Sequence, residues 1–151
     1  MRRVGAFTLV EIMIVVSIIA LLVVIALPSF QRARQRAQNA KLINGLRVAT
    51  DAFQMYAVEH NAYPPDVNRG VVPAGMALYF GPTFDFTKPT PIGGNWDWDY
   101  QQFGFTAGVS IVGSGADTTR MSEIDAKIDD GDLSTGGFQN TAADRYTFII
   151  E

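Results

Sequence analysis

The chain has 151 residues, of which 48% are hydrophobic and 18% charged, and its formal net charge is −3. This composition predicts one folded domain, with or without a small appendage, and argues against intrinsic disorder. The sequence has no cysteine and one histidine, His60, which excludes disulfide scaffolds, thiolate zinc sites and a cysteine nucleophile. The negative net charge gives no support to nucleic-acid binding, so no nucleic-acid partner is expected.

Residues 7–27 form an almost uninterrupted apolar segment, FTLVEIMIVVSIIALLVVIAL. As an α-helix this segment would be about 31 Å long, which matches the hydrocarbon core of a bilayer. A cleavable signal peptide has a shorter apolar core followed by a small-residue cleavage site, whereas this run ends in the sequence LPSF. A buried core helix this apolar would need a large protein around it. The segment therefore predicts a membrane anchor.

One carboxylate, Glu11, lies inside this anchor. A charged side chain at the centre of a bilayer costs about 2.5–3.5 kcal/mol, and less near an interface. One interpretation is that Glu11 reaches the headgroups by snorkelling. The other is that Glu11 pairs with a cation. Because no Lys, Arg or His lies between Phe7 and Pro28, that cation must come from another chain or from a free α-amino group made by cleavage nearby.

The residues around Glu11 carry a family resemblance. Residues 5–11 read GAFTLVE, two arginines precede them, and the apolar helix follows. This arrangement resembles the processing site of type IV prepilins and of the pseudopilins of type II secretion. The resemblance is specific over the first 30 residues and weak beyond about residue 65.

The resemblance implies a leader peptide of residues 1–6, cleaved between Ala6 and Phe7. This cut makes Glu11 the fifth residue of the mature chain and Pro28 the twenty-second, and both spacings are usual in the family. The chain departs from the family in having Ala instead of Gly before the cut. The resemblance also implies N-methylation of the new α-amino group of Phe7.

The resemblance further implies a structural subunit, not an enzyme, that assembles into the helical filament of a type II secretion pseudopilus or a type IV pilus. Glu11 would pair with the Phe7 amino group of a neighbouring subunit. The implied partners are further copies or related pilins, the prepilin peptidase and N-methyltransferase, an inner-membrane assembly platform and membrane lipid. The absence of cysteine favours a pseudopilin, because many adhesive pilins close a C-terminal loop with a disulfide. The alternative is a membrane-anchored binding module whose head binds a sugar or metal and whose anchor is passive.

The charge distribution conflicts with the implied topology. Residues 29–50 hold five basic residues and no acid, whereas residues 51–151 hold five basic and fourteen acidic residues. The positive-inside rule would place the C-terminal side of the anchor in the cytoplasm. The resemblance implies the opposite, a single-pass protein of the bacterial inner membrane with a cytoplasmic leader and a periplasmic or extracellular head. On that topology the basic stretch needs another role, as a filament interface or a contact with anionic lipid.

Downstream of the anchor the sequence predicts a stem helix over residues 28–60. Pro28 should kink the helix without necessarily ending it. An apolar stripe at helical spacing follows, and the helix should stop near Asn61, because two prolines come soon after it. The stripe consists of Leu42, Leu46, Ala49, Phe53 and Tyr56.

Residues 61–151 predict a small head. Residues 61–95 are rich in proline and glycine and should form loops, with one short helical turn around residues 75–80. Two strands are expected within 96–112, a short helix over 121–130 with Ser122 as its N-cap, and a last strand over 146–150. The predicted fold class is α+β, a long N-terminal helix packed on a small antiparallel sheet.

A late loop carries the candidate metal site. Four oxygen-bearing side chains stand within six residues, namely Asp129, Asp130, Asp132 and Ser134. Calcium takes six to eight oxygen ligands, so this cluster is a candidate calcium site. The spacing of an EF-hand loop is absent, so we interpret the cluster as a solvated turn after the preceding helix, with a calcium site as the alternative. No cofactor is expected.

The remaining motifs have structural interpretations. Residues 96–99 read WDWD, which on a strand places both indoles on one face and both carboxylates on the other. We interpret this as a half-buried strand with a solvated face, in preference to a sugar or acid–base site. His60, near the end of the stem, is interpreted as a partner for the negative end of the helix dipole. The sequence contains no phosphate-binding loop or nucleophile elbow.

Overall fold

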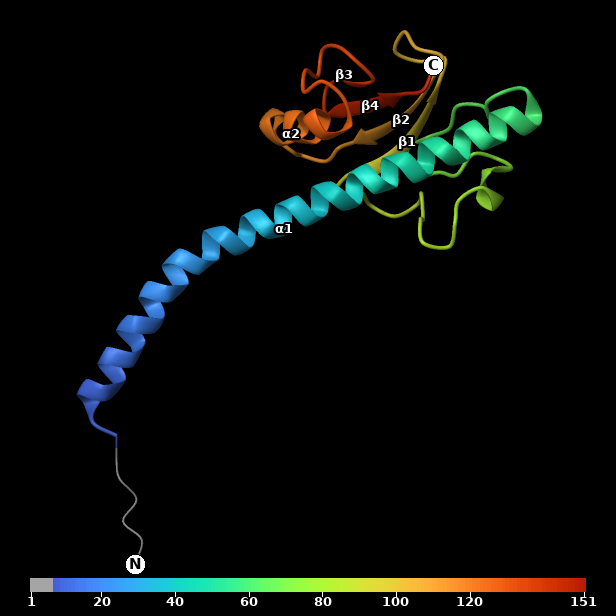
Figure 1. The fold of residues 1–151 in the computed structure, drawn as a ribbon. Coiled ribbons are helices and arrows are strands. Elements are labelled where there is room, and N and C mark those ends of the chain that lie inside the picture. Colours follow the sequence, from blue (N-terminus) through green and yellow to red (C-terminus); the bar gives the residue numbers. More distant parts are fainter. Residues whose placement is uncertain (1–6) are drawn as a thin grey trace, which may run out of the picture. The chain divides into compact units, whose positions relative to one another are not determined.

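The computed structural model describes residues 7–151, so the predicted leader of residues 1–6 lies outside the described part of the chain. The first element is one long helix, α1 (Leu9–His60), followed by a short 3-10 turn, η1 (Met76–Leu78), and a small head (Figure 1). The chain divides into two compact units, one ending at Ala37 and one that spans Gln38–Glu151. The helix is assigned without a break through Pro28, and the predicted stem is shared between the two units.

Helix α1 ends where the sequence predicted. Its last residue is His60, and Asn61 follows in the left-handed region with φ 52. Left-handed backbone terminates helices, and asparagine tolerates it better than most residues. The His60 ring lies 3.0 Å (Nδ1) from the carbonyl oxygen of Tyr56 and stacks on the Tyr56 ring. The His60 ring therefore lies in the last turn of the helix, against the Tyr56 carbonyl.

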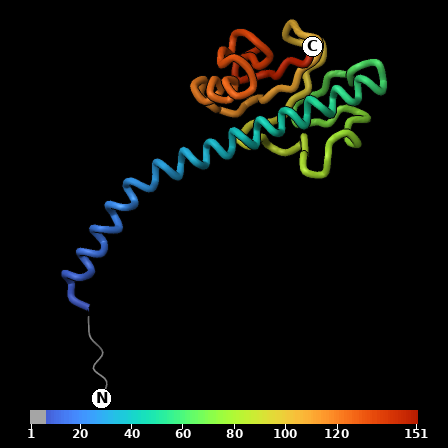
Figure 2. Tube along the Cα trace, viewed as in Figure 1, coloured from blue at the N-terminus to red at the C-terminus, as the bar shows by residue number. Residues whose placement is uncertain are grey.

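The head contains a four-stranded antiparallel sheet with the order β1-β2-β4-β3. The strands are β1 (Asn95–Tyr100), β2 (Ala107–Val112), β3 (Phe138–Ala142) and β4 (Arg145–Ile149). The red C-terminal end of the trace thus belongs to an inner strand of the sheet (Figure 2). This arrangement confirms the predicted α+β class and the three expected strands, but the sequence analysis did not identify β3.

Helix α2 (Thr118–Ile128) begins three residues earlier than predicted and has a different N-cap. The Asp117 carboxylate accepts a hydrogen bond from the Arg120 amide at 2.7 Å, so Asp117 is the N-cap and the assignment of Ser122 was wrong. The predicted turn around residues 75–80 is confirmed by η1.

The core lies between α1 and one face of the sheet. The predicted stripe is confirmed, because Leu42, Leu46 and Phe53 are at most 2% exposed. The Phe53 ring stacks on the Trp98 indole with 3.7 Å between centroids. Trp96 packs directly on Gly45, where an added Cβ would come within 2.9 Å of the indole. The glycine therefore weakens the helix locally but allows close approach of the sheet.

The carboxylates on the other face of the sheet are buried, so the prediction of a solvated strand face was wrong. Asp97 and Asp99 are 5% and 3% exposed. The Arg145 guanidinium bonds Asp99 at 2.6 Å and Asp97 at 2.7 Å, and it lies 4.7 Å from the centroid of the Phe103 ring. Buried carboxylates need such a partner, because desolvating an unpaired charge is costly. The sequence could not show that a cation more than forty residues away covers them.

Both edges of the sheet are partly occupied by other segments of the same chain. Beside β1, the Gly70 amide donates to the Trp96 carbonyl at 2.7 Å, and the Tyr100 amide donates to the Asp66 carboxylate at 3.2 Å. Beside β3, the Asn140 amide donates to the Leu133 carbonyl at 2.8 Å. Backbone groups that would otherwise be free at a sheet edge are therefore used internally.

Candidate functional sites

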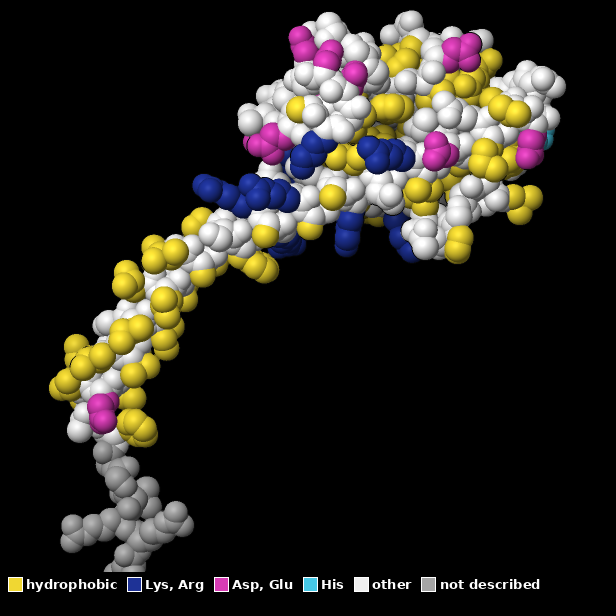
Figure 3. Space-filling model, in the orientation of Figure 1, with side chains coloured by type: hydrophobic (Ala, Val, Ile, Leu, Met, Phe, Trp, Pro, Cys, Tyr) yellow, Lys and Arg dark blue, Asp and Glu magenta, His cyan; other side chains and the backbone are white. Residues whose placement is uncertain are grey.

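The N-terminal part of α1 presents apolar side chains that are exposed in the described chain. Between residues 9 and 27 their exposed fractions run from 45% for Val23 to 76% for Leu9. Figure 3 shows these side chains covering the helix surface. In the described residues, one helix is long and apolar enough to cross a membrane, Leu9–His60, and its most apolar window is unburied. Such a surface needs a bilayer or other apolar helices around it.

Glu11 is held by Thr8 at the start of this helix. One carboxylate oxygen, Oε2, accepts hydrogen bonds from the Thr8 amide and the Thr8 hydroxyl, both at 2.9 Å. In return the Glu11 amide donates to the Thr8 hydroxyl at 3.2 Å. This reciprocal arrangement is a capping box. Within residues 7–151, Oε1 of Glu11 receives no hydrogen bond. The sequence analysis did not identify Thr8, although its spacing of three residues before Glu11 is the signal of this motif.

The remaining predicted residues of the N-terminal segment are placed as follows. Ala6 lies outside the described residues, so the structure does not test the cleavage point. Phe7 is 79% exposed at the beginning of the described chain. Pro28 lies within α1.

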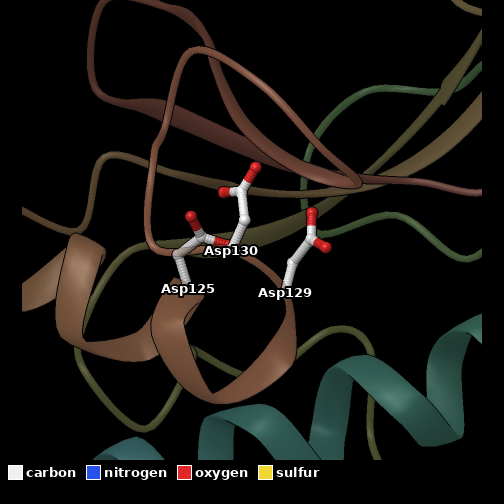
Figure 4. A group of neighbouring side chains, drawn as sticks. All are labelled: Asp125, Asp129 and Asp130. Carbon is white, nitrogen blue, oxygen red and sulfur yellow. The ribbon is translucent and has the colours of Figure 1, made fainter.

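A second candidate site lies at the end of α2. Asp125 lies in the last turns of α2, and Asp129 and Asp130 are the first two residues after the helix. The carboxylate oxygens of these three residues lie within 4.8 Å of one another (Figure 4). Asp125 is 0% exposed, and neither of its carboxylate oxygens has a hydrogen-bond partner in the described part of the chain. Burial raises the pKa of Asp125 to about 6, and the neighbouring charges of Asp130 and Asp129 act in the same direction.

The other two predicted calcium ligands lie outside this acidic cluster. Asp132 accepts hydrogen bonds from the amide of Ser134 at 3.0 Å and from its hydroxyl at 2.6 Å, which makes a local turn. The structure therefore brings together Asp129, Asp130 and Asp125. The i, i+4 spacing of Asp125 and Asp129 on a helix was the available signal for the missed residue.

The donor set of the acidic cluster fits a hard divalent cation. Three carboxylates supply up to six oxygens, and calcium prefers carboxylate and other oxygen ligands. Some of these oxygens already serve the loop. Asp129 accepts a hydrogen bond from the Gly137 amide. Asp130 accepts hydrogen bonds from the Asp132 amide and the Thr135 hydroxyl, both at 2.8 Å. The buried Asp125 carboxylate has no such role.

The aspartates of β1 do not form a sugar-binding or acid–base site. Both carboxylates bond the same guanidinium, that of Arg145. The Ser110 hydroxyl donates to Asp99 and lies 2.7 Å from the Thr147 hydroxyl, which extends the network across the sheet. Burial raises the pKa of Asp97, and the hydrogen bond from Arg145 opposes this effect. These groups stabilise the sheet from its second face.

Comparison with known proteins finds similarities in the N-terminal part of the chain. The family described as "Prokaryotic N-terminal methylation motif" matches residues 1–27. The chain is 36% identical over 63 residues to the type IV wide pilus major component PilA4 of Thermus thermophilus. The matched region covers 42% of this chain and 48% of that protein. It is 30% identical over 63 residues to the type II secretion system core protein G of Aeromonas hydrophila, with 42% of this chain and 44% of that protein covered.

A third relative, the type II secretion system core protein G of Klebsiella pneumoniae, is 31% identical over 64 residues, which are 42% of this chain and 46% of that protein. The matched region thus spans less than half the length of each of these curated relatives. No solved structure matches the chain. The N-terminal segment matches the methylation-motif family and is similar to a type IV pilus component and to type II secretion core proteins, in agreement with the resemblance noted in the sequence.

Proposed function

We propose that this protein is a structural subunit of a type II secretion pseudopilus or a type IV pilus, and that it assembles into a helical filament through α1. The observation that carries the proposal is an unburied apolar helix with a single carboxylate in its first turn, joined to a separately packed head. The relatives matched by this segment are, by name, a pilus component and secretion core proteins. The role is structural and involves no reaction of its own.

The apolar half of α1 serves in two environments. Before assembly it lies in the inner membrane as a single-pass anchor, with the leader in the cytoplasm and the head on the periplasmic or extracellular side. After assembly the same side chains pack against other copies in the filament core. Both surroundings are apolar, so the exposed surface between residues 9 and 27 is satisfied in each.

Glu11 supplies the specific contact in this scheme. Cleavage between Ala6 and Phe7 by a prepilin peptidase, with N-methylation, creates a cationic α-amino group on Phe7. Thr8 occupies one oxygen of the Glu11 carboxylate and leaves Oε1 free in the described chain. That oxygen would accept the Phe7 amine of the next subunit. Phe7 lies two residues before α1, and Glu11 lies in its first turn, so an axial stagger between subunits that matches their separation brings the amine to the carboxylate.

A second role is proposed for the acidic cluster of Asp125, Asp129 and Asp130, which we infer binds calcium. The buried, unpartnered carboxylate of Asp125 supports this proposal. A calcium ion there would offset two of the three negative charges of these carboxylates and fix the loop between α2 and β3. The ion would stabilise the head, without a direct part in filament contacts.

Electron microscopy of sheared cell surfaces and of cells that overproduce the protein tests the filament proposal. Wild-type cells should carry filaments that contain the protein, and cells lacking the gene should lack them, with recovery on complementation. Because the chain has no cysteine, a double variant with cysteines in α1 at residues 10 and 14 would report on subunit contacts by cross-linking. A passive anchor that carries a binding head would give membrane-bound protein with neither filaments nor cross-linked ladders.

A further inference from the structure

Three arginines lie on two opposite faces of α1 directly after its apolar part. Arg32, Arg34 and Arg36 are all exposed. At 100° per residue, Arg34 lies roughly 200° around the helix from Arg32, and Arg36 roughly 40° from it. Arg32 and Arg36 therefore share one face of the helix, and Arg34 lies on the nearly opposite face. We call this group the arginine collar. Figure 3 shows Lys and Arg side chains gathered on α1 where the apolar surface ends.

The collar has no anionic partner in the described chain. The ion pairs of residues 7–151 involve Lys88 and Arg145, not the collar. After Glu11 the next acidic residue along the chain is Asp51, too far along the helix to neutralise these cations. The three exposed guanidinium groups are therefore available to an anion from outside the described chain.

The distance between the collar and the apolar segment identifies that anion. Arg32 is about 7.5 Å beyond Leu27 along the helix, and Arg36 about 13.5 Å. The polar headgroup layer extends roughly 5–8 Å beyond the hydrocarbon core on each side. Side chains on a helix tilt toward its N-terminus, which here is toward the membrane. The long arginine side chains thus reach back to the level of the lipid phosphates.

We propose that the arginine collar binds the phosphate groups of anionic lipids in the leaflet nearest the head. This inference rests on the membrane-anchor part of the proposed function and not on filament assembly. Guanidinium groups match phosphate oxygens in a bidentate geometry. Their distribution around the helix fits a headgroup layer that surrounds the anchor, since a single protein surface would meet only one side. The collar fixes the depth of the unassembled subunit and gives the cations a role on the non-cytoplasmic side.

Quenching by brominated lipids tests the collar with the full-length chain. Phe30 is 68% exposed and lies next to the collar, so Phe30→Trp provides a probe. The natural Trp96 and Trp98 are at most 3% exposed. Their background fluorescence is measured with the chain that lacks the Phe30 substitution. The protein is reconstituted into vesicles of phosphatidylglycerol and phosphatidylcholine at a ratio of one to four. Bromine is carried on the acyl chains of one lipid or of the other.

We expect phosphatidylglycerol to be enriched around the probe roughly two- to five-fold over its bulk share, since each cation near an anionic surface favours binding by about that factor. The enrichment should fall as sodium chloride is raised. It should vanish when the three arginines are replaced by glutamine and persist when they are replaced by lysine. A matched variant that removes three exposed head cations, Arg69→Gln with Lys88→Gln and Lys127→Gln, should retain it.

Equal quenching by the two brominated lipids in the wild-type collar would overturn the proposal. An unchanged enrichment in the glutamine variant, with loss of filaments, would assign the arginines to a protein contact and also overturn it. Absence of quenching by either lipid would contradict the anchor itself and the collar with it. Absence of filaments from wild-type cells, together with enrichment of phosphatidylglycerol around the wild-type protein, would instead count against the assembly proposal alone.

Discussion

Thr8 and Glu11 form reciprocal hydrogen bonds at the first turn of α1. The Thr8 hydroxyl donates to Glu11 Oε2 at 2.9 Å and accepts from the Glu11 amide at 3.2 Å. The carboxylate is therefore held in place within one chain. One oxygen stays available, which a cation from outside the described chain can approach. The geometry separates the positioning of Glu11 from its partner, and the two can be tested independently.

Replacing Glu11 should impair filament assembly and leave membrane insertion intact. Glu11→Ala makes the segment more apolar, so insertion should be unchanged or improved. Assembly would bury the Phe7 amine of the next subunit without its partner, and losing one member of a desolvated ion pair costs about 3–5 kcal/mol. Glu11→Gln keeps the shape and removes the charge, so it should also fail. A sheared-filament assay beside membrane fractionation measures both effects. Normal filaments from Glu11→Ala would favour the passive anchor.

Replacing Thr8 should give a smaller defect than replacing Glu11. Thr8→Val keeps the shape and removes the hydroxyl, and losing an N-cap side chain costs about 1 kcal/mol. Glu11 would keep its charge but lose one of the two bonds that hold Oε2. Filament yield should fall partially in Thr8→Val and recover in Thr8→Ser, as measured by the same shearing assay. Equal yields from the valine and serine variants would show that the hydroxyl has no part in assembly.

Processing should occur between Ala6 and Phe7. This cut places Glu11 fifth and Pro28 twenty-second in the mature chain, and it makes the Phe7 amine available to Glu11. Intact mass and N-terminal sequencing of protein extracted from membranes should show a chain that begins with N-methylated phenylalanine. A mature chain that begins at Ala6, or one that keeps Met1, would contradict the assignment.

The buried Asp125 should make the head less stable as pH rises. Its folded-state pKa is about 6 against an ordinary value of 3.8. The folded state binds the proton more tightly, so the free energy of unfolding falls as pH rises from about 4 through about 6. Asp125→Asn should remove this loss and raise the free energy of unfolding at pH 7 by roughly 1–3 kcal/mol. Near-ultraviolet circular dichroism of the full chain in detergent with chelator reports on the tryptophans of the head. Identical pH profiles for wild type and variant would contradict the prediction.

Calcium should reverse this destabilisation. Millimolar calcium should raise the unfolding midpoint of the wild type by several degrees at pH 7, because a ligand that binds only the folded state stabilises it. Asp125→Asn should lose most of the response. Asp132→Asn is the matched control, since the Asp132 carboxylate bonds Ser134 outside the acidic cluster, and it should respond as the wild type does. The calcium proposal fails when wild-type midpoints in calcium and in chelator coincide.

Removing Arg145 should destabilise the head strongly. Arg145→Met leaves the carboxylates of Asp97 and Asp99 buried without their cation, and breaking a buried ion pair from one side costs about 3–5 kcal/mol. Denaturant unfolding followed by the fluorescence of Trp96 and Trp98 measures the loss. A triple variant, Arg145→Met with Asp97→Asn and Asp99→Asn, should recover part of it. A change below about 1 kcal/mol in Arg145→Met would mean that solvent reaches the carboxylates.

Local patterns in the sequence were sufficient for α1 and for the core face of β1. The apolar run, the stripe that includes Phe53 and the prolines beyond Asn61 act through nearest neighbours on one helix, so their effect is visible in the sequence. Alternation likewise placed Trp96 and Trp98 on the buried face.

The failures have different physical causes. β3 has a mixed burial pattern at the sheet edge and no apolar alternation, so pairing with β4 defines it. The burial of Asp97 and Asp99 depends on Arg145, far along the chain. Asp125 joins Asp129 and Asp130 because the chain turns directly after α2. Thr8 is different, since its capping motif was present in the sequence but lay inside a segment interpreted as an anchor.

The occupied edges of the head sheet have a consequence for polymerisation. In a filament the heads stand side by side at very high local concentration, a condition under which open strands recruit one another. Here the strand borders at Trp96 and Asn140 already accept or donate bonds within their own subunit. Growth by strand addition between heads is thereby disfavoured, which in the proposed filament would leave the contacts between subunits to the helices.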